Sequence, residues 1–302
     1  MLSTIKKIFA VCCIALTSFI SQTVMAKPLT IGMSFQEMNN PYFVTMKSAL
    51  EQAGKDIGAT IYVADARHDV SKQINDIEDM LQKKIDILLI NPADSVGVQS
   101  AVLSAHNAGA VVVAIDAQAE GPIDAFVGSK NYDAGYLAGQ YLGKNLNGKG
   151  QVAILDGIPV VPILDRVRGF EAAMKTFPGI KIVTKQNGKQ ERDTALTVTE
   201  NMLQAHPDLN GIFSVNDVGA LAAIQASGSK VKLVSVDGHP EAIKEILKPN
   251  SPFIATAAQF PRDQVRIGLG IALAKYWGAN VPKTIPVDVK LIDKSNAQGF
   301  SW

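Results

Sequence analysis

The sequence predicts an α/β protein made of two similar lobes, each a doubly wound parallel sheet, joined by a hinge of several chain crossings. Short apolar runs rich in β-branched residues recur along the 302 residues, and such runs are typical of strands buried on both faces of a parallel sheet. Helical segments alternate with these runs, which indicates βαβ units with right-handed crossovers. The chain also exceeds the size of about 250 residues at which a single hydrophobic core stops growing.

Residues 1–26 have the pattern of a secretory signal peptide. Lys6 and Lys7 precede an apolar stretch, and small residues end the segment. The apolar stretch is shorter than the about 20 residues of a spanning helix, which weakens the alternative of a retained membrane anchor. A lipoprotein anchored through Cys12 or Cys13 is weaker still, because no good lipobox precedes either residue. We therefore expect a periplasmic protein whose mature form has no cysteine and no disulfide.

The charge balance argues against nucleic acid as a partner. The full chain has 29 Lys and Arg residues against 28 Asp and Glu residues, and removal of residues 1–26 leaves 27 against 28. A near-neutral chain without a basic stripe is not typical of nucleic-acid-binding proteins. The four histidines lack the spacing of a metal site or a catalytic triad, so we expect no metal, no cofactor and no catalytic residues.

The first series of strands and helices ends near residue 146. Each expected strand is a β-branched or apolar run, and each expected helix follows a cap or turn residue. In order, we expect a strand at 29–35, a helix at 41–55, a strand at 60–64, a helix at 70–83, a strand at 87–90, a helix at 96–107, strands at 111–115 and 126–128, and a helix at 136–146.

The pattern then starts again, which predicts a second lobe of similar size. The expected elements are a strand at 152–155, a helix at 163–176, a strand at 180–184, a helix at 194–205, a strand at 211–215, a helix at 218–226, a strand at 231–236, a helix at 240–247 and a strand at 253–257. No linker rich in proline or serine separates the two series.

We expect the chain to cross between the lobes three times, near 128–131, 259–262 and 286–291. Several close crossings make a hinge, because a few backbone torsions can absorb a rigid-body closure. The expected N-terminal lobe is 27–129 plus 261–288, and the expected C-terminal lobe is 130–260 plus 289–302.

Polar side chains follow six of the expected strands at the point where each strand ends. Alone, each would more often be a turn former or a helix cap. Together they predict one crevice, because ligands of open α/β sheets bind beyond the carboxyl ends of the strands. Amides and carboxylates can hold vicinal hydroxyls with two hydrogen bonds, which favours a neutral ligand with many hydroxyls. The six residues are Asn91, Asp116, Asp156, Asn216, Asp237 and Gln259.

Two further segments carry candidate binding residues. Asn40 is a natural N-cap before Pro41, and the adjacent Tyr42 and Phe43 either pack in the core or stack on the apolar face of a sugar ring. In the helix at 163–176, Arg166 and Arg168 are two residues apart.

We expect one of these two arginines to face the crevice and the other to face solvent. Arg166 could donate two hydrogen bonds to adjacent ring hydroxyls. Placed between Asp116 and Asp237, it would also keep the two carboxylates from facing each other unpaired.

Ordered motifs give the chain a strong resemblance over residues 28–293 to the ribose-type periplasmic sugar-binding proteins that feed ATP-driven importers. No single motif is specific, but the set in this order is. The motifs are Asn-Asn-Pro-Tyr-Phe at 39–43, Ile-Asn-Pro-Ala-Asp-Ser at 90–95, Ile-Asp at 115–116, Arg-x-x-Gly-Phe at 166–170, Ala-His-Pro-Asp at 205–208, Asn-Asp at 216–217, Asp-Gly-x-Pro-Glu at 237–241 and Ala-Gln at 258–259.

This resemblance implies a two-lobed receptor that closes around its ligand and is then recognised by an ABC-type permease. Two positions depart from the ribose binders, which have Arg at the place of Ala117 and an aromatic residue at the place of Gln190. We therefore expect a larger ring, a furanose, a cyclitol or an acyclic polyol rather than ribopyranose. The ligand residues that the resemblance implies are Asn40, Tyr42, Phe43, Asn91, Asp116, Arg166, Asn216, Asp237 and Gln259, with Gln190 beside them.

Three other functions compete with solute binding. A secreted carbohydrate-active enzyme is disfavoured because neighbouring amides and Arg166 would keep both candidate aspartates ionised, leaving no general acid. A sugar-responsive repressor of the same fold would carry a helix-turn-helix segment where this chain has the signal peptide. Presentation of the bound ligand to a chemoreceptor is compatible with transport, and the sequence does not separate the two. We expect the protein to act as a monomer.

Overall fold

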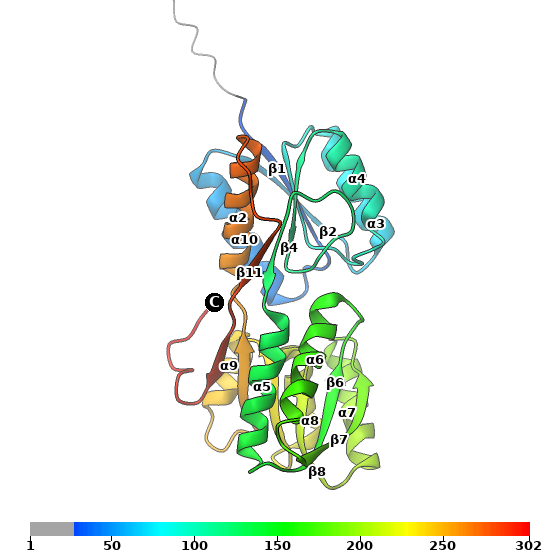
Figure 1. The fold of residues 1–302 in the computed structure, drawn as a ribbon, viewed down its shortest axis with the longest axis vertical. Helices are drawn as coiled ribbons and strands as arrows, with labels where there is room; N and C mark the ends of the chain where they lie inside the picture. The colour runs from blue at the N-terminus through cyan, green and yellow to red at the C-terminus, as the bar shows by residue number, and fades with distance from the viewer. Residues whose placement is uncertain (1–26) are drawn as a thin grey trace, which may run out of the picture.

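The computed structural model describes residues 27–302, which form two α/β lobes stacked along the long axis of the molecule (Figure 1). Residues 1–26, on which the prediction of a signal peptide falls, lie outside the described residues. The predicted fold class is confirmed, because each lobe contains a six-stranded sheet that is parallel or nearly so, with helices on both faces.

The first lobe is built around a fully parallel sheet with the strand order β11-β5-β4-β3-β1-β2. Its elements up to the first crossing are β1 Thr30–Phe35, α2 Pro41–Asp56, β2 Thr60–Asp65, α3 Val70–Gln82, β3 Ile87–Ile90, α4 Gln99–Asn107, β4 Val111–Ile115 and β5 Ala125–Ser129. The later elements α10 Pro261–Tyr276 and β11 Thr284–Val287 return to this lobe.

The second lobe repeats the arrangement with the strand order β12-β10-β9-β8-β6-β7. Its edge strand β12 is antiparallel to β10, and the other pairs are parallel. The elements are α5 Asn131–Asn145, β6 Lys149–Asp156, α6 Val161–Met174, β7 Gly179–Asn187, α7 Arg192–Ala205, β8 Leu209–Ser214, α8 Asp217–Ser227, β9 Lys232–Asp237, α9 Pro240–Leu247, β10 Phe253–Ala258 and β12 Lys290–Asp293.

The central strands are buried on both faces, as their continuous apolar sequence predicts. All four residues of β3 and all five residues of β4 are buried. One core cluster lies on each face of each sheet: α2 and α10 cover one face in the first lobe, and α3 and α4 cover the other. This double covering fixes the sheets, so that only the ends of the strands are available to face a partner lobe.

The chain passes between the two sheets at three places that lie close together (Figure 1). It leaves β5 for α5, leaves β10 for α10, and leaves β11 for β12. At the first and third of these crossings the backbone N–H of Lys130 donates to the carbonyl of Val287 at 2.9 Å. After β12 the chain runs back along this region, where Phe300 lies edge-on to Phe260 with 6.3 Å between ring centroids.

Two helices begin three or more residues away from the expected position. The helix expected at 96–107 begins at Gln99, because Oδ1 of Asp94 accepts hydrogen bonds from the N–H groups of Val96 at 2.9 Å and Gly97 at 2.6 Å and holds a turn there. The helix expected at 136–146 begins at Asn131, immediately after the crossing. No expected element covered α10.

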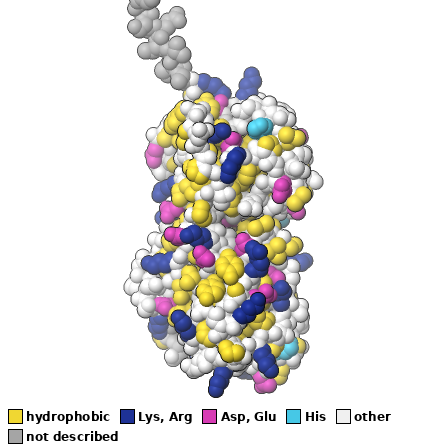
Figure 2. All heavy atoms as spheres, viewed as in Figure 1, with side chains coloured by type: hydrophobic (Ala, Val, Ile, Leu, Met, Phe, Trp, Pro, Cys, Tyr) yellow, Lys and Arg dark blue, Asp and Glu magenta, His cyan; other side chains and the backbone are white. Residues whose placement is uncertain are grey.

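The surface is mixed in charge. In the view of Figure 2, basic and acidic side chains are interspersed over both lobes, without a broad field of one sign. Within residues 27–302 no helix has the length and apolar composition that crossing a membrane requires.

Candidate functional site

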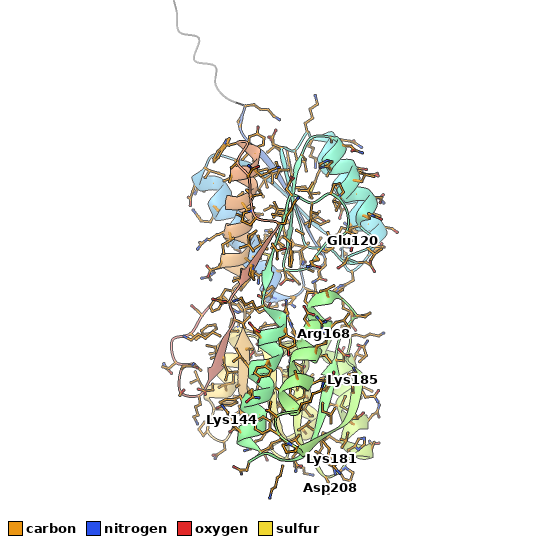
Figure 3. The ribbon with its side chains drawn as sticks, in the orientation of Figure 1. Glu120, Lys144, Arg168, Lys181, Lys185 and Asp208 are labelled. Carbon is orange, nitrogen blue, oxygen red and sulfur yellow. The ribbon has the colours of Figure 1, made fainter. Side chains whose placement is uncertain are left out.

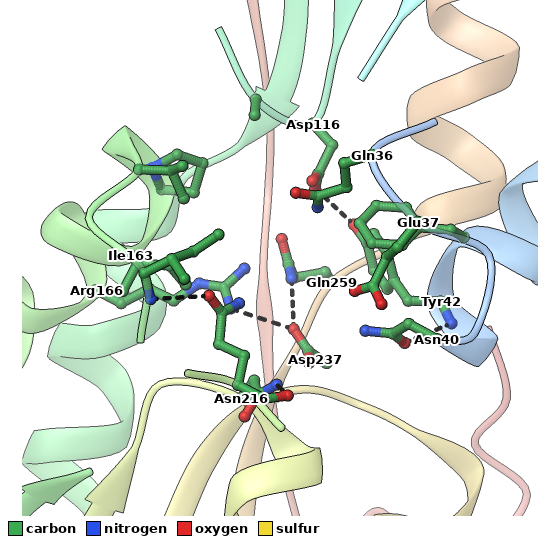
Figure 4. Close-up of a pocket in the computed structure, with 16 residues that line it drawn as sticks. Gln36, Glu37, Asn40, Tyr42, Asp116, Ile163, Arg166, Asn216, Asp237 and Gln259 are labelled. Atoms are coloured by element: carbon green, nitrogen blue, oxygen red, sulfur yellow. Dashed lines mark hydrogen bonds and ion pairs between the residues drawn. The ribbon is translucent and has the colours of Figure 1, made fainter. Parts of the chain in front are cut away.

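A polar cavity lies between the two lobes, at the carboxyl ends of the central strands of both sheets (Figure 4). The empty space between the lining atoms is about 490 Å³, part of which is open to solvent. Of the ten candidate residues, nine line this cavity: Asn40, Tyr42, Phe43, Asp116, Arg166, Gln190, Asn216, Asp237 and Gln259.

Asp116 lies on the wall formed by the first lobe, directly after β4. Its backbone φ of 67° is in the left-handed region, which turns the side chain from the sheet edge into the cavity. The hydroxyl of Tyr42 donates to Oδ1 at 3.2 Å, and Nδ2 of Asn91 donates to Oδ2 at 3.3 Å. Burial raises the pKa of this carboxyl to about 6, although the charge of Arg166 and the bond from Tyr42 oppose the rise. No cation contacts Asp116 among the described residues.

Asn91 does not line the cavity but lies behind Asp116. It is fully buried at the end of β3. Besides its bond to Asp116, it donates to the carbonyl of Ile115 at 3.3 Å and accepts from the N–H of Gln36 at 3.3 Å. Its place is therefore that of a support for the carboxylate. Asp156, the strand-end aspartate of β6, is also absent from the cavity lining, and it accepts from the N–H of Gly157 at 2.8 Å.

Asp237 and Arg166 form the opposite wall as an ion pair. Nη1 of Arg166 lies 3.3 Å from Oδ1 of Asp237 and also donates to the carbonyl of Val215 at 2.8 Å. Nε2 of Gln259 donates to the same Oδ1 at 2.7 Å. Burial raises the pKa of Asp237, and the adjacent Arg166 works against that rise. A buried carboxylate with a cationic partner is held in one orientation before any ligand arrives.

The helix that carries Arg166 is held by a close contact between α5 and α6. A Cβ atom on Gly135 would lie 1.9 Å from the carbonyl oxygen of Arg166, and one on Gly169 would lie 2.0 Å from that of Tyr132. Only glycine permits this approach of the two backbones. It brings Asn131 within reach, so that its Oδ1 accepts from Nε of Arg166 at 2.8 Å.

The two arginines lie on opposite sides of α6, as expected. The side chain of Arg166 is 6% exposed, whereas that of Arg168 is 68% exposed and pairs with Asp165 on the same helix. Arg168, labelled in Figure 3, is not among the residues that line the cavity. Arg166 was expected to lie between the two aspartates. It donates a hydrogen bond to Asp237 but does not contact Asp116, whose pKa it lowers only by electrostatic attraction at a distance.

The segment after β1 forms the third side of the cavity. Oδ1 of Asn40 accepts from the N–H of Tyr42 at 3.0 Å, which makes Asn40 the N-cap of α2, with Pro41 in the first turn. Tyr42 and Phe43 are buried in the core cluster and also line the cavity. Nε2 of Gln264 donates to the Tyr42 hydroxyl at 2.6 Å. That hydroxyl is therefore already engaged, which leaves the ring face and Phe43 for apolar contact.

Asn216, Gln190 and Gln259 complete the polar lining. Oδ1 of Asn216 caps α8 through the N–H of Gly219 at 2.9 Å, and its Nδ2 donates to the carbonyl of Gln190 at 3.4 Å. Oε1 of Gln190 accepts from the N–H of Ile158 at 3.2 Å. Gln259 is 1% exposed, and its Oε1 accepts no hydrogen bond from any residue in 27–302. A buried acceptor of this kind favours a ligand that donates.

Several lining residues were not among the expected ones. Gln36 and Glu37 follow β1 directly, so the rule that polar residues gather at strand ends could have found them. Glu37 lies 3.2 Å from Nε2 of His68, and this hydrogen bond raises the pKa of His68. An apolar patch lines the other side, formed by Ile158, Val160, Pro162 and Ile163 in and after the loop that precedes α6.

Asp217 is a second buried acid beside the site but outside the cavity lining. It accepts from the hydroxyls of Ser235 and, at 2.7 Å, Thr256, and from the N–H of His239 at 2.7 Å. Burial and the nearby charge of Asp237 raise its pKa to about 7. Asp217, the first residue of α8, is therefore hydrogen-bonded to both β9 and β10 close to Asp237. Within the described part of the chain no cluster of three His, Cys, Asp or Glu residues could hold a metal ion.

Comparisons with known proteins agree with this architecture. The family model of the periplasmic binding protein domain matches residues 31–278. The chain is 37% identical over 269 residues to the ribose import binding protein RbsB of Bacillus subtilis (strain 168). The aligned region covers 88% of this chain and 87% of that protein.

Two solved structures are similar over nearly their whole length. An ABC transporter solute-binding protein from Mycobacterium smegmatis with bound glycerol has a TM-score of 0.85 and 33% identity, covering 90% of this chain and 96% of that one. One from Actinobacillus succinogenes 130z with bound D-allose has a TM-score of 0.84 and 31% identity, covering 91% and 100%. The chain therefore belongs to the periplasmic binding protein family, among its ribose-type members.

Proposed function

We propose that this protein captures a sugar or polyol between its two lobes in the periplasm and delivers it to an ABC-type membrane permease. Its family consists of binding proteins rather than enzymes, and family membership implies a periplasmic location. The signal peptide expected at residues 1–26 would provide the route there. The proposed cleft closes by rotation of the lobes 27–129 plus 261–288 and 130–260 plus 289–302 about the three crossings.

The observation that carries this proposal is the pairing of two buried aspartates on opposite walls of one cavity. Asp116 comes from the first lobe and Asp237 from the second, and each is less than a tenth exposed. Oε1 of Gln259 lies between them without a donor in the described chain (Figure 4). Carboxylate and amide oxygens that converge in this way accept hydrogen bonds from hydroxyls. A ligand with several hydroxyls can bridge the walls, and these shared contacts favour the closed state.

Charge and shape narrow the ligand class. The cavity lining includes Glu37, Asp116 and Asp237 against one cation, Arg166, which disfavours sugar phosphates and sugar acids. Ala117 leaves space beside Asp116, and Gln190 presents an amide rather than an aromatic face. We infer a larger ring, a furanose, a cyclitol or an acyclic polyol. One relative is named for ribose, and two similar structures contain glycerol and D-allose. These three compounds therefore belong among the ligands to be tested.

Thermal unfolding of the ligand-stripped protein against a panel tests the proposal. The panel contains D-ribose, D-allose, xylitol, glycerol, myo-inositol, a galactofuranoside, ribose 5-phosphate and two amino acids. A compound at 100 times its Kd should stabilise the folded protein by about 2.7 kcal/mol. Stabilisation by a neutral sugar or polyol and none by ribose 5-phosphate supports the proposal. Stabilisation by the phosphate or an amino acid alone, or by no compound, contradicts it.

Two partner proposals remain part of this function. The permease should recognise the closed form, so a pull-down with membranes that contain the permease should depend on the compound found in the panel.

We also propose that the protein acts as a monomer, which size-exclusion chromatography with light scattering measures. A chemoreceptor that reads the same closed form is a second proposed partner. It is tested by whether deletion of the protein abolishes chemotaxis toward that compound while a permease deletion does not.

A further inference from the structure

Trp302 lies behind the cavity and touches both of its walls. Its ring is 8% exposed. It meets Tyr42 of the first lobe edge-on, with 5.6 Å between ring centroids, and His239 of the second lobe in the same geometry and at the same distance. Its Nε1 donates to the backbone carbonyl of Asp237 at 2.9 Å. Trp302 is not among the residues that line the cavity, so its contacts act on the binding residues and not on a ligand.

The hydrogen bond from Trp302 is to a residue, Asp237, whose backbone conformation is unfavourable. Asp237 has φ of 135°, in the region that favours glycine, and Gly238 follows with φ of 83°. A residue with a side chain holds such a conformation only where its surroundings fix it. The Asp237 carbonyl accepts from the N–H of Gln259 at 2.9 Å as well as from Trp302. The indole therefore helps to fix the peptide that aims the Asp237 carboxylate at the cavity.

Through Tyr42, Trp302 is also linked to Asp116. The Tyr42 hydroxyl donates to Asp116 and accepts from Gln264, which also donates to the hydroxyl of Ser129 at 2.8 Å. Displacement of the Tyr42 ring would move this hydroxyl and remove a hydrogen bond from Asp116. One side chain is thus one contact away from both carboxylates that face each other across the cavity.

The segment that carries Trp302 spans the two lobes. Ala297 belongs to a core cluster of the second lobe, Trp302 belongs to the core cluster of the first, and Phe300 packs against both. Residues 297–302 thus form a further link across the hinge. An apolar side chain wedged at that point limits how far one wall can slide past the other, because packed cores deform little.

We propose that Trp302 is a positioning residue that keeps Asp116 and Asp237 in register across the cavity and limits the range of lobe orientations. The role in affinity rests on the proposed binding function, whereas the role in lobe orientation does not. A core residue that only stabilises the fold would alter the unfolding midpoint and leave affinity and lobe orientation unchanged.

Three variants separate these roles: Trp302→Ala, Trp302→Phe, which keeps a ring but loses the N–H donor, and the control Trp277→Ala. Trp277 is 74% exposed and is the only other tryptophan of the chain. Calorimetry measures the Kd for D-ribose, D-allose, xylitol and myo-inositol. Inter-lobe distances come from spin labels on Glu120→Cys in the first lobe and Lys181→Cys in the second, two exposed sites that Figure 3 marks. The full chain carries Cys12→Ser and Cys13→Ser, so that only these sites are labelled.

We expect Trp302→Ala to weaken binding about tenfold or more and Trp302→Phe by a smaller factor, because the latter keeps an aromatic ring and loses the hydrogen bond to Asp237. Both variants should widen the distribution of inter-lobe distances in the ligand-free protein, and Trp277→Ala should change neither quantity. If Trp302→Ala does not fold, Trp302→Phe decides. Wild-type Kd values together with a wild-type distance distribution in a folded Trp302 variant overturn the proposal.

The ligand-free distances separate a failure of this proposal from a failure of the binding function. If the wild type binds no neutral sugar or polyol of the panel, the sugar-binding proposal fails, and a widened distribution in Trp302→Phe still supports the positioning role. If the wild type binds and both variants have unchanged affinity and unchanged distances, the positioning role is wrong while the binding function stands.

Discussion

Asp116 and Asp237 occupy matching places in the two lobes, each at the carboxyl end of a central strand, but they are held by different chemistry. Asp237 has a cation, Arg166, at 3.3 Å and an amide donor at 2.7 Å. Asp116 has only neutral donors, at 3.2 and 3.3 Å. The wall of the second lobe is therefore organised by charge before a ligand binds. The wall of the first lobe keeps a poorly compensated carboxylate that gains the most when hydroxyls donate to it.

The largest effect should come from removal of the cation that organises the second wall. Arg166→Ala leaves Asp237 buried without its partner and removes the bonds to Asn131 and Val215. Loss of one member of a buried ion pair costs about 3–5 kcal/mol of folding stability, and binding should become undetectable. Urea unfolding and calorimetry measure both effects. The control Arg168→Ala removes an exposed surface pair worth about 0–1 kcal/mol; a loss of binding equal to that of Arg166→Ala would mean that the arginine was wrongly assigned.

Asp237→Ala should have the next largest effect on ligand binding. Truncation removes the acceptor of a ligand hydroxyl and the carboxylate partner of Arg166, which we expect to reduce binding by roughly 2–4 kcal/mol. The matched control is Asp156→Ala, since Asp156 also ends a strand of the same sheet but does not line the cavity. Titration calorimetry with the panel compound that binds best decides, and equal affinities of wild type and Asp237→Ala would exclude Asp237 from the site.

Asp116→Asn should have opposite effects on folding stability and on ligand affinity at high pH, and its effect on stability should depend on pH. The pKa of Asp116 is raised from 3.8 to about 6 in the folded protein. The folded state thus holds a proton that the unfolded chain releases, and this contribution to stability is present below pH 3.8 and lost as the pH rises through 6. At pH 8 the ligand-free variant should be more stable than wild type by roughly 1–3 kcal/mol.

This gain should disappear at pH 4, where Asp116 of the wild type is largely protonated in the folded protein. Affinity for the panel compound should fall at pH 8, because an amide accepts fewer hydrogen bonds than a carboxylate. Denaturant titrations at the two pH values measure the difference. A variant that is less stable than wild type at pH 8 would show that the buried charge is compensated better than its contacts indicate.

Tyr42→Phe should have the smallest effect of the four. It removes the hydroxyl that donates to Asp116 and leaves the ring packed against Trp302 and Phe43. We expect a loss of about 0.5–1.5 kcal/mol in affinity. Tyr132→Phe, at a residue that is 43% exposed, is the control and should bind as the wild type does. If Tyr42→Phe binds more tightly than wild type, the hydroxyl competes with the ligand for Asp116.

Strand-end residues show how much of the site could be predicted from the sequence. The alternation of strands and helices determines which ends meet at the crevice, so Asp116, Asn216, Asp237 and Gln259 were found there. The same rule cannot tell how far each side chain reaches beyond the sheet edge. Asn91, at the end of its strand, turns back to hold Asp116 instead of entering the cavity.

Contacts between distant segments were beyond the reach of the sequence pattern. Arg166 pairs with Asp237 alone because glycines at the α5–α6 contact set its position, and no local pattern encodes that crossing. Trp302 reaches Tyr42 across 260 positions of the chain. Hydrophobic periodicity describes faces of single elements and contains no information on such partners.

The most direct test of the account is a crystal structure of the protein with the panel compound that stabilises it most. The account predicts the compound between the lobes, with hydroxyls within hydrogen-bonding distance of both Asp116 and Asp237 and one hydroxyl donating to Oε1 of Gln259. A compound that contacts only one lobe, or that leaves both aspartates with their present partners alone, would contradict it.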